Sequence, residues 1–130
     1  MSNNSVPKPQ EGKPIYTGPT PTMALSSPSE YFGTYTTMIV STSEAISPSN
    51  LKWCISDGND NTKASGNIVL GEAITSGGFS VLTYDNDGDN NLSAGDSFSV
   101  YDSTGKIQSG WKFTIIFKPS NEIIAQVPFS

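Results

Sequence analysis

The sequence predicts an all-β fold, an antiparallel β-sandwich of immunoglobulin-like or similar type. Apolar and polar residues alternate with period two through most of the chain after residue 30, which is the period of a half-buried strand. Turn signals rich in Gly, Pro, Asn and Asp separate these runs at about every 8–12 residues, as in sandwiches and barrels. The 130 residues are 35% hydrophobic and 15% charged, a composition too poor in helix formers for a helical bundle.

Residues 1–28 are predicted to be a tail or linker, and residues 29–130 the sandwich domain. The first segment holds six of the nine prolines, and proline favours extended conformations over helix. The alternative is that part of the tail docks on the domain as an edge strand, because the tail contains four apolar residues: Ile15, Tyr16, Met23 and Leu25.

Strands are predicted in chain order from the alternation. The first covers residues 35–40, and in the second Leu51, Trp53 and Ile55 share one face before a turn at Asp57-Gly58. Residues 57–67 are expected to be polar loop, residues 68–70 a short strand, and residues 71–76 are compatible with one short helical turn. FSVLTY and SFSVY form two further strands on either side of an acidic segment.

The clearest alternation lies at the end of the chain and predicts a hairpin. Trp111, Phe113, Ile115 and Phe117 fall on one face of the first strand; Ile123, Ala125, Val127 and Phe129 fall on one face of the second. The turn between them is Pro119-Ser120-Asn121. One buried face is therefore expected on each strand.

Charge and residue usage exclude several classes of function. The net charge is −5 and the lysines form no cluster, so the chain lacks the basic stripe that a nucleic-acid binder needs. Histidine is absent and Cys54 is the single cysteine, which removes Ser-His and Cys-His catalytic pairs and internal disulfides. We expect no enzyme, and a packed strand position for Cys54.

Residues 85–96 read D-N-D-G-D-N-N-L-S-A-G-D. Oxygen side chains occupy positions one, three, five, nine and twelve of this frame, and position seven would add a backbone carbonyl; the six residues are Asp85, Asp87, Asp89, Asn91, Ser93 and Asp96. Alternate residues of a tight loop can aim their oxygens at one centre, and this is the ligand spacing of an EF-hand calcium loop. The sequence therefore predicts a Ca²⁺ site here.

Two positions depart from the EF-hand pattern. Position six is Asn90 instead of glycine, although asparagine tolerates the left-handed backbone conformation. Position twelve is Asp96 instead of the longer glutamate. Leu92, at position eight, is expected to anchor the loop to the core. Because the flanks are β-type and not helical, we expect a structural calcium loop and no calmodulin-like switch; an ordinary Asp/Asn/Gly turn is the alternative.

A second acidic segment, residues 57–61, is interpreted as a turn. The same frame applied to it would place Ile68 at the last ligand position, and isoleucine has no oxygen to offer. Asn3 and Asn91 lie in N-x-[ST] glycosylation sequons.

The stretch YDNDGDNNLSAGDSFSV resembles the outer domain of archaeal type IV pilin-like surface proteins, in which a strand enters a D-x-D-G-(D/N)…LS-A-G-D-x-F segment. The final hairpin, GWKFTIIF and NEIIAQVPF, and the upstream GTYTTMIVSTSEAISPSNLKWCISDG resemble strands of the same domain, so that the resemblance covers about residues 33–130. It implies the soluble C-terminal β domain of such a protein. Family members begin with a hydrophobic anchoring helix, and this chain has no apolar run of the ~18–20 residues that a membrane helix needs. The full-length form is therefore expected to be membrane-anchored or in a filament.

Motif and resemblance together predict a non-enzymatic, extracellular, cell-surface domain with a structural or adhesion role, stabilised by Ca²⁺. Its partners would be other pilin-like subunits or surface proteins. The alternative is a calcium-dependent carbohydrate- or ligand-binding module of a larger secreted protein, with glycans as partners. Tyr31, Phe32, Tyr84 and Tyr101 are candidates for its aromatic platform, and packing in the core or on a strand face is the favoured interpretation of these four residues. A dockerin-like module would need a second DxDxD loop, and a hydrolase would need two facing carboxylates away from residues 85–96.

Overall fold

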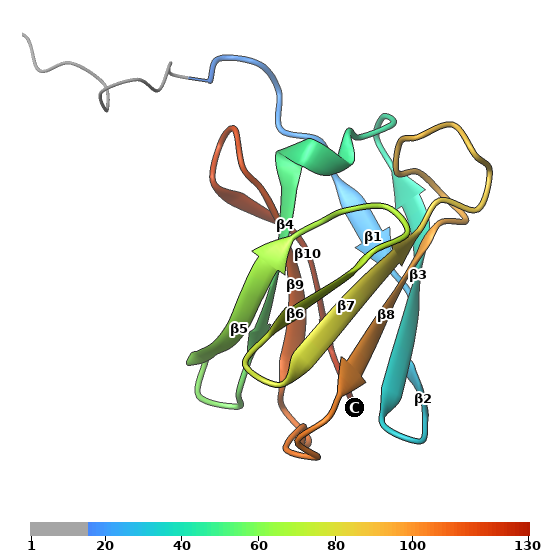
Figure 1. Cartoon of the computed structure of the whole chain (residues 1–130). Helices are drawn as coiled ribbons and strands as arrows, with labels where there is room; N and C mark the ends of the chain where they lie inside the picture. The colour runs from blue at the N-terminus through green and yellow to red at the C-terminus, as the bar shows by residue number, and fades with distance from the viewer. Residues whose placement is uncertain (1–15) are drawn as a thin grey trace, which may run out of the picture.

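The computed structural model describes residues 16–130, in which two antiparallel sheets pack face to face (Figure 1). The larger sheet has the order β1-β3-β8-β7-β6, with β2 also paired to β3. Its strands are β1 (Met23–Leu25), β2 (Ser29–Tyr31), β3 (Thr34–Thr42), β6 (Ala73–Ser76), β7 (Phe79–Tyr84) and β8 (Ser97–Asp102). The smaller sheet has the order β10-β9-β4-β5. Its strands are β4 (Leu51–Ser56), β5 (Thr62–Asn67), β9 (Lys112–Phe117) and β10 (Glu122–Pro128).

This arrangement confirms the predicted fold class. Strands make up 51% of the described residues, 16–130, and a 3₁₀ turn, η2 (Pro48–Asn50), precedes β4. No helix within residues 16–130 has the length and apolar character to cross a membrane.

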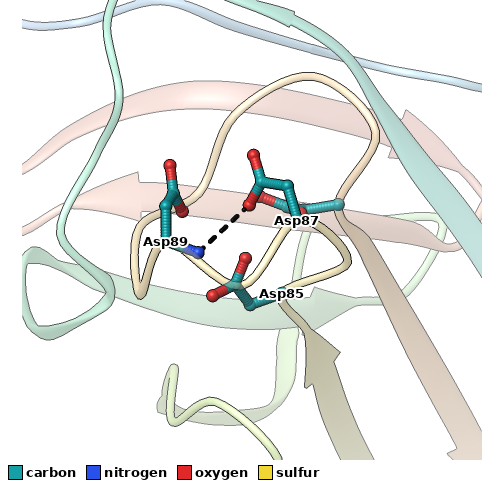
Figure 2. Close-up of side chains that lie close together, drawn as sticks. Asp85, Asp87 and Asp89 are labelled. Atoms are coloured by element: carbon teal, nitrogen blue, oxygen red, sulfur yellow. Dashed lines mark hydrogen bonds between the residues drawn. The ribbon is translucent and has the colours of Figure 1, made fainter.

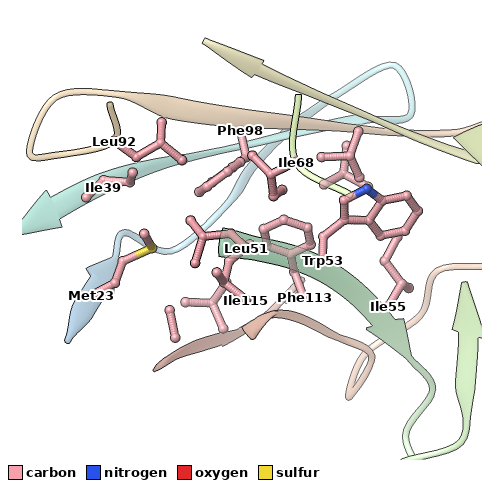
Figure 3. Packing of buried hydrophobic residues seen from close by; sticks show 14 of the residues in the cluster. Met23, Ile39, Leu51, Trp53, Ile55, Ile68, Leu92, Phe98, Phe113 and Ile115 are labelled. Atoms are coloured by element: carbon pink, nitrogen blue, oxygen red, sulfur yellow. The ribbon is translucent and has the colours of Figure 1, made fainter. Parts of the chain in front are cut away.

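The hydrophobic core fills the space between the two sheets (Figure 3). The smaller sheet contributes Leu51, Trp53 and Ile55 from β4, all with 0% exposure as the alternation predicted. Gly66 of β5 lies directly against Trp53, because a Cβ there would come within 2.9 Å of the indole ring. Full burial of an aliphatic side chain such as Leu51 or Ile55 stabilises the folded state by about 1.5–3 kcal/mol. The apolar face of β4 therefore helps to hold the two sheets together.

The terminal hairpin confirms the predicted strands and turn, with one correction. Phe113, Ile115 and Phe117 of β9 are buried, as are Ala125 and Val127 of β10 and Phe129, which directly follows β10. Ile123 was expected on the same face, but it is 61% exposed. The register shifts between Ile123 and Ala125. Because a bulge adds one residue to one strand, it rotates the residues before it to the opposite face.

Residues 57–76 differ from the prediction in three places. The expected loop at 57–67 contains strand β5, and the expected helical turn at 71–76 contains strand β6. Residues 68–70, predicted as a strand, form only an isolated bridge from Leu70 to Thr83. Both β5 and β6 are edge strands with largely exposed side chains, so they lack the apolar alternation by which a strand is recognised.

The predicted tail contributes a strand to the larger sheet. β1 lies within residues 1–28 and pairs Met23 with Thr42 of β3, and the Met23 side chain is buried in the core. The sandwich therefore begins before the expected boundary at residue 29. This agrees with the alternative in which Met23 and Leu25 dock part of the tail as an edge strand. The residues before Tyr16, including Ile15 and the sequon at Asn3, lie outside the described part of the chain.

β1 and β2 share one side of β3. The first pairs with the stretch from Ile39 to Thr42, and the second pairs with the stretch from Thr34 to Thr36. The other side of β3 pairs with β8. β3 is thus covered on one side by two short segments in succession.

Candidate metal site

Strands β7 and β8 bring the two ends of the acidic loop together. Their register pairs Tyr84 with Ser97, so Asp85 and Asp96 each adjoin a paired position. The loop projects from the upper end of the sandwich between these two strands (Figure 1). Hairpin pairing therefore places the first and last candidate ligands of the frame beside each other.

The returning half of the loop is fixed to the body of the domain. Leu92 and Ile46 exchange two backbone hydrogen bonds of 2.8 and 2.9 Å, and both side chains are buried. The N–H of Gly95 donates to Ile39 O at 2.9 Å, and the N–H of Ile39 donates to Asp96 O at 2.8 Å. The prediction that Leu92 anchors the loop to the core is confirmed.

Four of the six predicted ligands lie together. One carboxylate oxygen from each of Asp85, Asp87, Asp89 and Asp96 falls within 4.8 Å of the others. The carboxylates of Asp85, Asp87 and Asp89 face one another across the loop (Figure 2). Asp96 is fully buried, whereas Asp87 and Asp89 are exposed. The set combines an inner carboxylate with outer ones that solvent can reach.

The other two predicted ligands contact this cluster through their backbone. The N–H of Asn91 donates to Asp89 Oδ1 at 2.9 Å, and the N–H of Ser93 donates to Asp96 Oδ2 at 2.9 Å. Asp96 also accepts from Asn86 N through Oδ1 at 2.8 Å. The buried carboxylate thus joins the outgoing and returning halves of the loop.

Backbone hydrogen bonds also orient Asp85. Its Oδ1 accepts from Gly88 N at 3.0 Å, and its Oδ2 accepts from Asn90 N at 2.6 Å. Asn90 has φ +64°, which is the left-handed conformation that the sequence pattern required at position six. Asparagine tolerates this conformation because its short polar side chain adds little strain.

The protonation of the loop reflects crowding of its acids. Burial opposes ionisation of Asp85, but hydrogen bonds from the Asp87 side chain and from backbone N–H groups outweigh it and hold the pKa of Asp85 below its ordinary value. The pKa of Asp87 is raised, chiefly because it shares that hydrogen bond with Asp85. Ion pairs among residues 16–130 join Lys63 to Asp57 and Lys112 to Asp60, and neither neutralises this loop.

The donor chemistry fits a hard cation. All the candidate ligand atoms are oxygens, the type that Ca²⁺ prefers, and soft thiolate or imidazole ligands of transition metals are absent from the cluster. A divalent ion would offset repulsion among carboxylates packed this closely.

The second acidic segment is a turn, as interpreted from the sequence. Asp57 Oδ1 accepts from Asn59 N at 2.8 Å and from Asn61 N at 3.0 Å. These backbone hydrogen bonds, with that from Asn61 the larger effect, hold the pKa of Asp57 below its ordinary value. Its acids join no multi-carboxylate cluster in the described part of the chain.

A cleft of about 320 Å³ adjoins the acidic loop, which the sequence did not predict. It is lined by Leu70, Gly71, Thr83, Tyr84, Asp85, Asn86 and Asn90. Tyr84 is 41% exposed. Tyr84 was a candidate for a sugar-binding surface in the sequence. The cleft itself depends on the bridge between Leu70 and Thr83, which no local sequence pattern predicts.

A carboxylate outside the acidic loop also escaped prediction. Asp102, at the end of β8, is only 7% exposed, and it accepts hydrogen bonds from the backbone N–H groups of Thr104, Gly105 and Ile107. The sequence feature that could have identified it is the turn-forming stretch Asp102-Ser103-Thr104-Gly105. This carboxylate organises its own loop.

Comparison with protein-family models, with curated proteins and with solved structures gives no match for this chain.

Proposed function

We propose that the chain is a non-enzymatic, extracellular, pilin-like structural or adhesion domain, stabilised by a calcium ion bound in the loop 85–96. The convergence of four carboxylates, with oxygen atoms within 4.8 Å of one another, carries the metal part of this proposal. The resemblance of residues 33–130 to the outer domain of pilin-like proteins carries the surface role.

The role of the ion is structural in this proposal. Leu92 and the backbone of Asp96 fix the returning half of the loop to the sandwich, and the exposed half carries Asp87 and Asp89. A cation bridging the halves would restrain the exposed half against the fixed one. Since β7 and β8 are already paired on either side, the ion has no helix pair to open.

Calcium is expected to raise the thermal unfolding midpoint of the chain by several degrees relative to EDTA. Loops of this kind bind at about 10⁻⁴–10⁻³ M, so about 10 mM calcium would stabilise the folded state by roughly 1.4–2.7 kcal/mol. Differential scanning calorimetry in calcium, magnesium and EDTA measures the effect. Magnesium should give little, because it demands near-octahedral geometry and gives up its water reluctantly.

Two aspartate variants assign the effect to the loop. Asp85→Ala removes a ligand from the cluster and should abolish the calcium-dependent shift. Asp60→Ala is the matched control, because Asp60 lies in the other acidic turn and pairs with Lys112 at 3.0 Å. Equal calcium shifts in the wild type and both variants would show that the ion binds elsewhere. No calcium shift in the wild type would show that residues 85–96 form an acidic turn without a metal site.

One observation favours a calcium-dependent carbohydrate-binding module as a second candidate. The cleft beside the loop combines the Tyr84 ring with the amides of Asn86 and Asn90, and a sugar offers an apolar face and hydroxyls to such groups. Glycan-array binding that is lost in EDTA and in Tyr84→Ala would support this candidate. Retention of binding in both conditions would exclude this cleft.

A further inference from the structure

The β2–β3 hairpin presents two exposed aromatic side chains at its tip. Tyr31 is 75% exposed and Phe32 is 83% exposed, and their rings contact edge to face with centroids 4.5 Å apart. The hairpin lies at the lower end of the sandwich in Figure 1. We call Tyr31 and Phe32 the aromatic tip.

The backbone at this tip is strained for the residue that occupies it. The connection consists of Phe32 and Gly33, with φ of +49° and +82°, which is the positive-φ pattern of a type I′ turn. Asn-Gly is the favoured pair in that turn, and a bulky residue at positive φ is an outlier. Strained backbone is concentrated at functional sites, so an exposed aromatic residue held in a strained position indicates a contact surface.

A cleft of suitable size and character lies at the opposite end of the same sandwich. It has a volume of about 440 Å³ and is lined by Pro48, Ile68, Val69 and Leu70, by the polar residues Ser47, Ser49 and Asn67, and by Lys118. Residues 48–50 form η2, which lies at the upper end in Figure 1. Pockets that hold small organic molecules span roughly 300–1,000 Å³, so this cleft has room for an aromatic side chain.

The charges beside the tip and the cleft are complementary. Glu30 precedes the aromatic tip, and its carboxylate accepts the N–H of Gly33 at 2.8 Å while remaining exposed. Lys118 is exposed at the cleft, and its Nζ contacts the neutral Asn67 Oδ1 at 3.3 Å. A tip entering the cleft of another molecule would bring a carboxylate toward an ammonium group.

We propose that the aromatic tip of one copy of this chain inserts into a second copy, in the cleft between Pro48 and residues 68–70. Tip and cleft lie at opposite ends of one sandwich, so the same contact cannot close between two copies. It repeats head to tail, so each associated pair keeps one free tip and one free cleft and association continues with concentration. The contact uses residues outside the loop 85–96 and does not require bound calcium.

Sedimentation velocity of the full chain over a range of concentrations tests the proposal. The wild-type average mass should rise with concentration, and Phe32→Asn should weaken association at least tenfold. The same variant should raise the thermal midpoint, because asparagine suits the left-handed position better than phenylalanine. Val40→Thr is the matched control: Val40 is 59% exposed on β3, away from the tip, and its substitution should leave association unchanged.

Mixing two defective variants tests the head-to-tail geometry. Lys118→Glu should weaken association by itself, and Glu30→Lys combined with Lys118→Glu should restore it. Phe32→Asn mixed with Lys118→Glu should form dimers that grow no further, because only one intact tip and one intact cleft can meet. A wild type that stays monomeric at every concentration, or association unaffected by Phe32→Asn, would overturn the proposal, as would larger oligomers in the mixture.

Discussion

Replacing Trp53 with alanine is expected to lower the free energy of unfolding by about 3–5 kcal/mol, because the substitution deletes a fully buried indole ring. The ring contacts the backbone of Gly66 and lies close to Ile74, and rigid strands on both sides limit how far the sheets can close around the cavity. Total stabilities of small domains are about 5–15 kcal/mol, so this loss approaches the limit for folding. Chemical unfolding followed by circular dichroism measures it.

Two further substitutions identify the cause. Trp53→Phe keeps an aromatic ring and removes an indole N–H that has no hydrogen-bond partner among the described residues; it should cost clearly less than Trp53→Ala. Trp111→Ala is the control, because Trp111 is only half-buried at the margin of the core, where it packs against Phe79. Equal losses in all three variants would show that packing around Trp53 is not what stabilises the core.

Replacing Asp102 with asparagine is expected to cost about 2–4 kcal/mol at neutral pH. The carboxylate accepts from the N–H groups of Thr104 and Gly105 through Oδ1, at 2.8 and 3.0 Å, and from Ile107 N through Oδ2 at 2.9 Å. Each hydrogen bond to a charged group contributes roughly 1.5–3 kcal/mol. Asparagine keeps the shape but turns one acceptor into a donor, so at least one N–H loses its partner. Urea unfolding at pH 7 measures the difference.

The effect of Asp102 should depend on pH in a defined direction. Burial favours the neutral acid, but the hydrogen bonds from Thr104, Ile107 and Gly105 outweigh it and hold the pKa of Asp102 below its ordinary value. A depressed pKa in the folded state stabilises the protein above the ordinary value, and this stabilisation is lost as pH falls through the folded pKa. The gap between wild type and Asp102→Asn should therefore narrow below about pH 4.

Asp60→Asn serves as the control for both measurements. Its carboxylate is 74% exposed in an ion pair with Lys112, and exposed pairs contribute about 0–1 kcal/mol. A gap between wild type and Asp102→Asn that stays constant down to pH 2 would contradict the assigned role of the Asp102 charge.

The sequence predicted those elements whose signal is local. Leu51, Trp53 and Ile55 alternate with polar neighbours because β4 has one face in the core, so the pattern and the burial have the same cause. Asn90 and Leu92 were predicted correctly for a similar reason, since a twelve-residue ligand frame fixes which position turns left-handed and which points inward.

Other features depend on contacts that no short segment reveals. β5 and β6 are polar edge strands, defined by pairing with β4 and β7 and not by their own pattern. The bulge that exposes Ile123 depends on its register with β9. The cleft beside Tyr84 needs residues 70 and 83 to meet. Sequence spacing gave the candidate ligands, whereas their surroundings arise from strand pairing across the fold.

The division of one side of β3 between β1 and β2 bears on how copies of the domain avoid uncontrolled aggregation. Long, flat edge strands with free N–H and C=O groups invite strand addition from another molecule, and short or interrupted edges discourage it. Here β1 and β2 have three residues each, with a register irregularity inside β1. On the smaller sheet β10 carries both a bulge and Pro128. Lateral growth by continuous sheet formation is therefore disfavoured at these edges, and crowded copies of the domain can remain separate side by side.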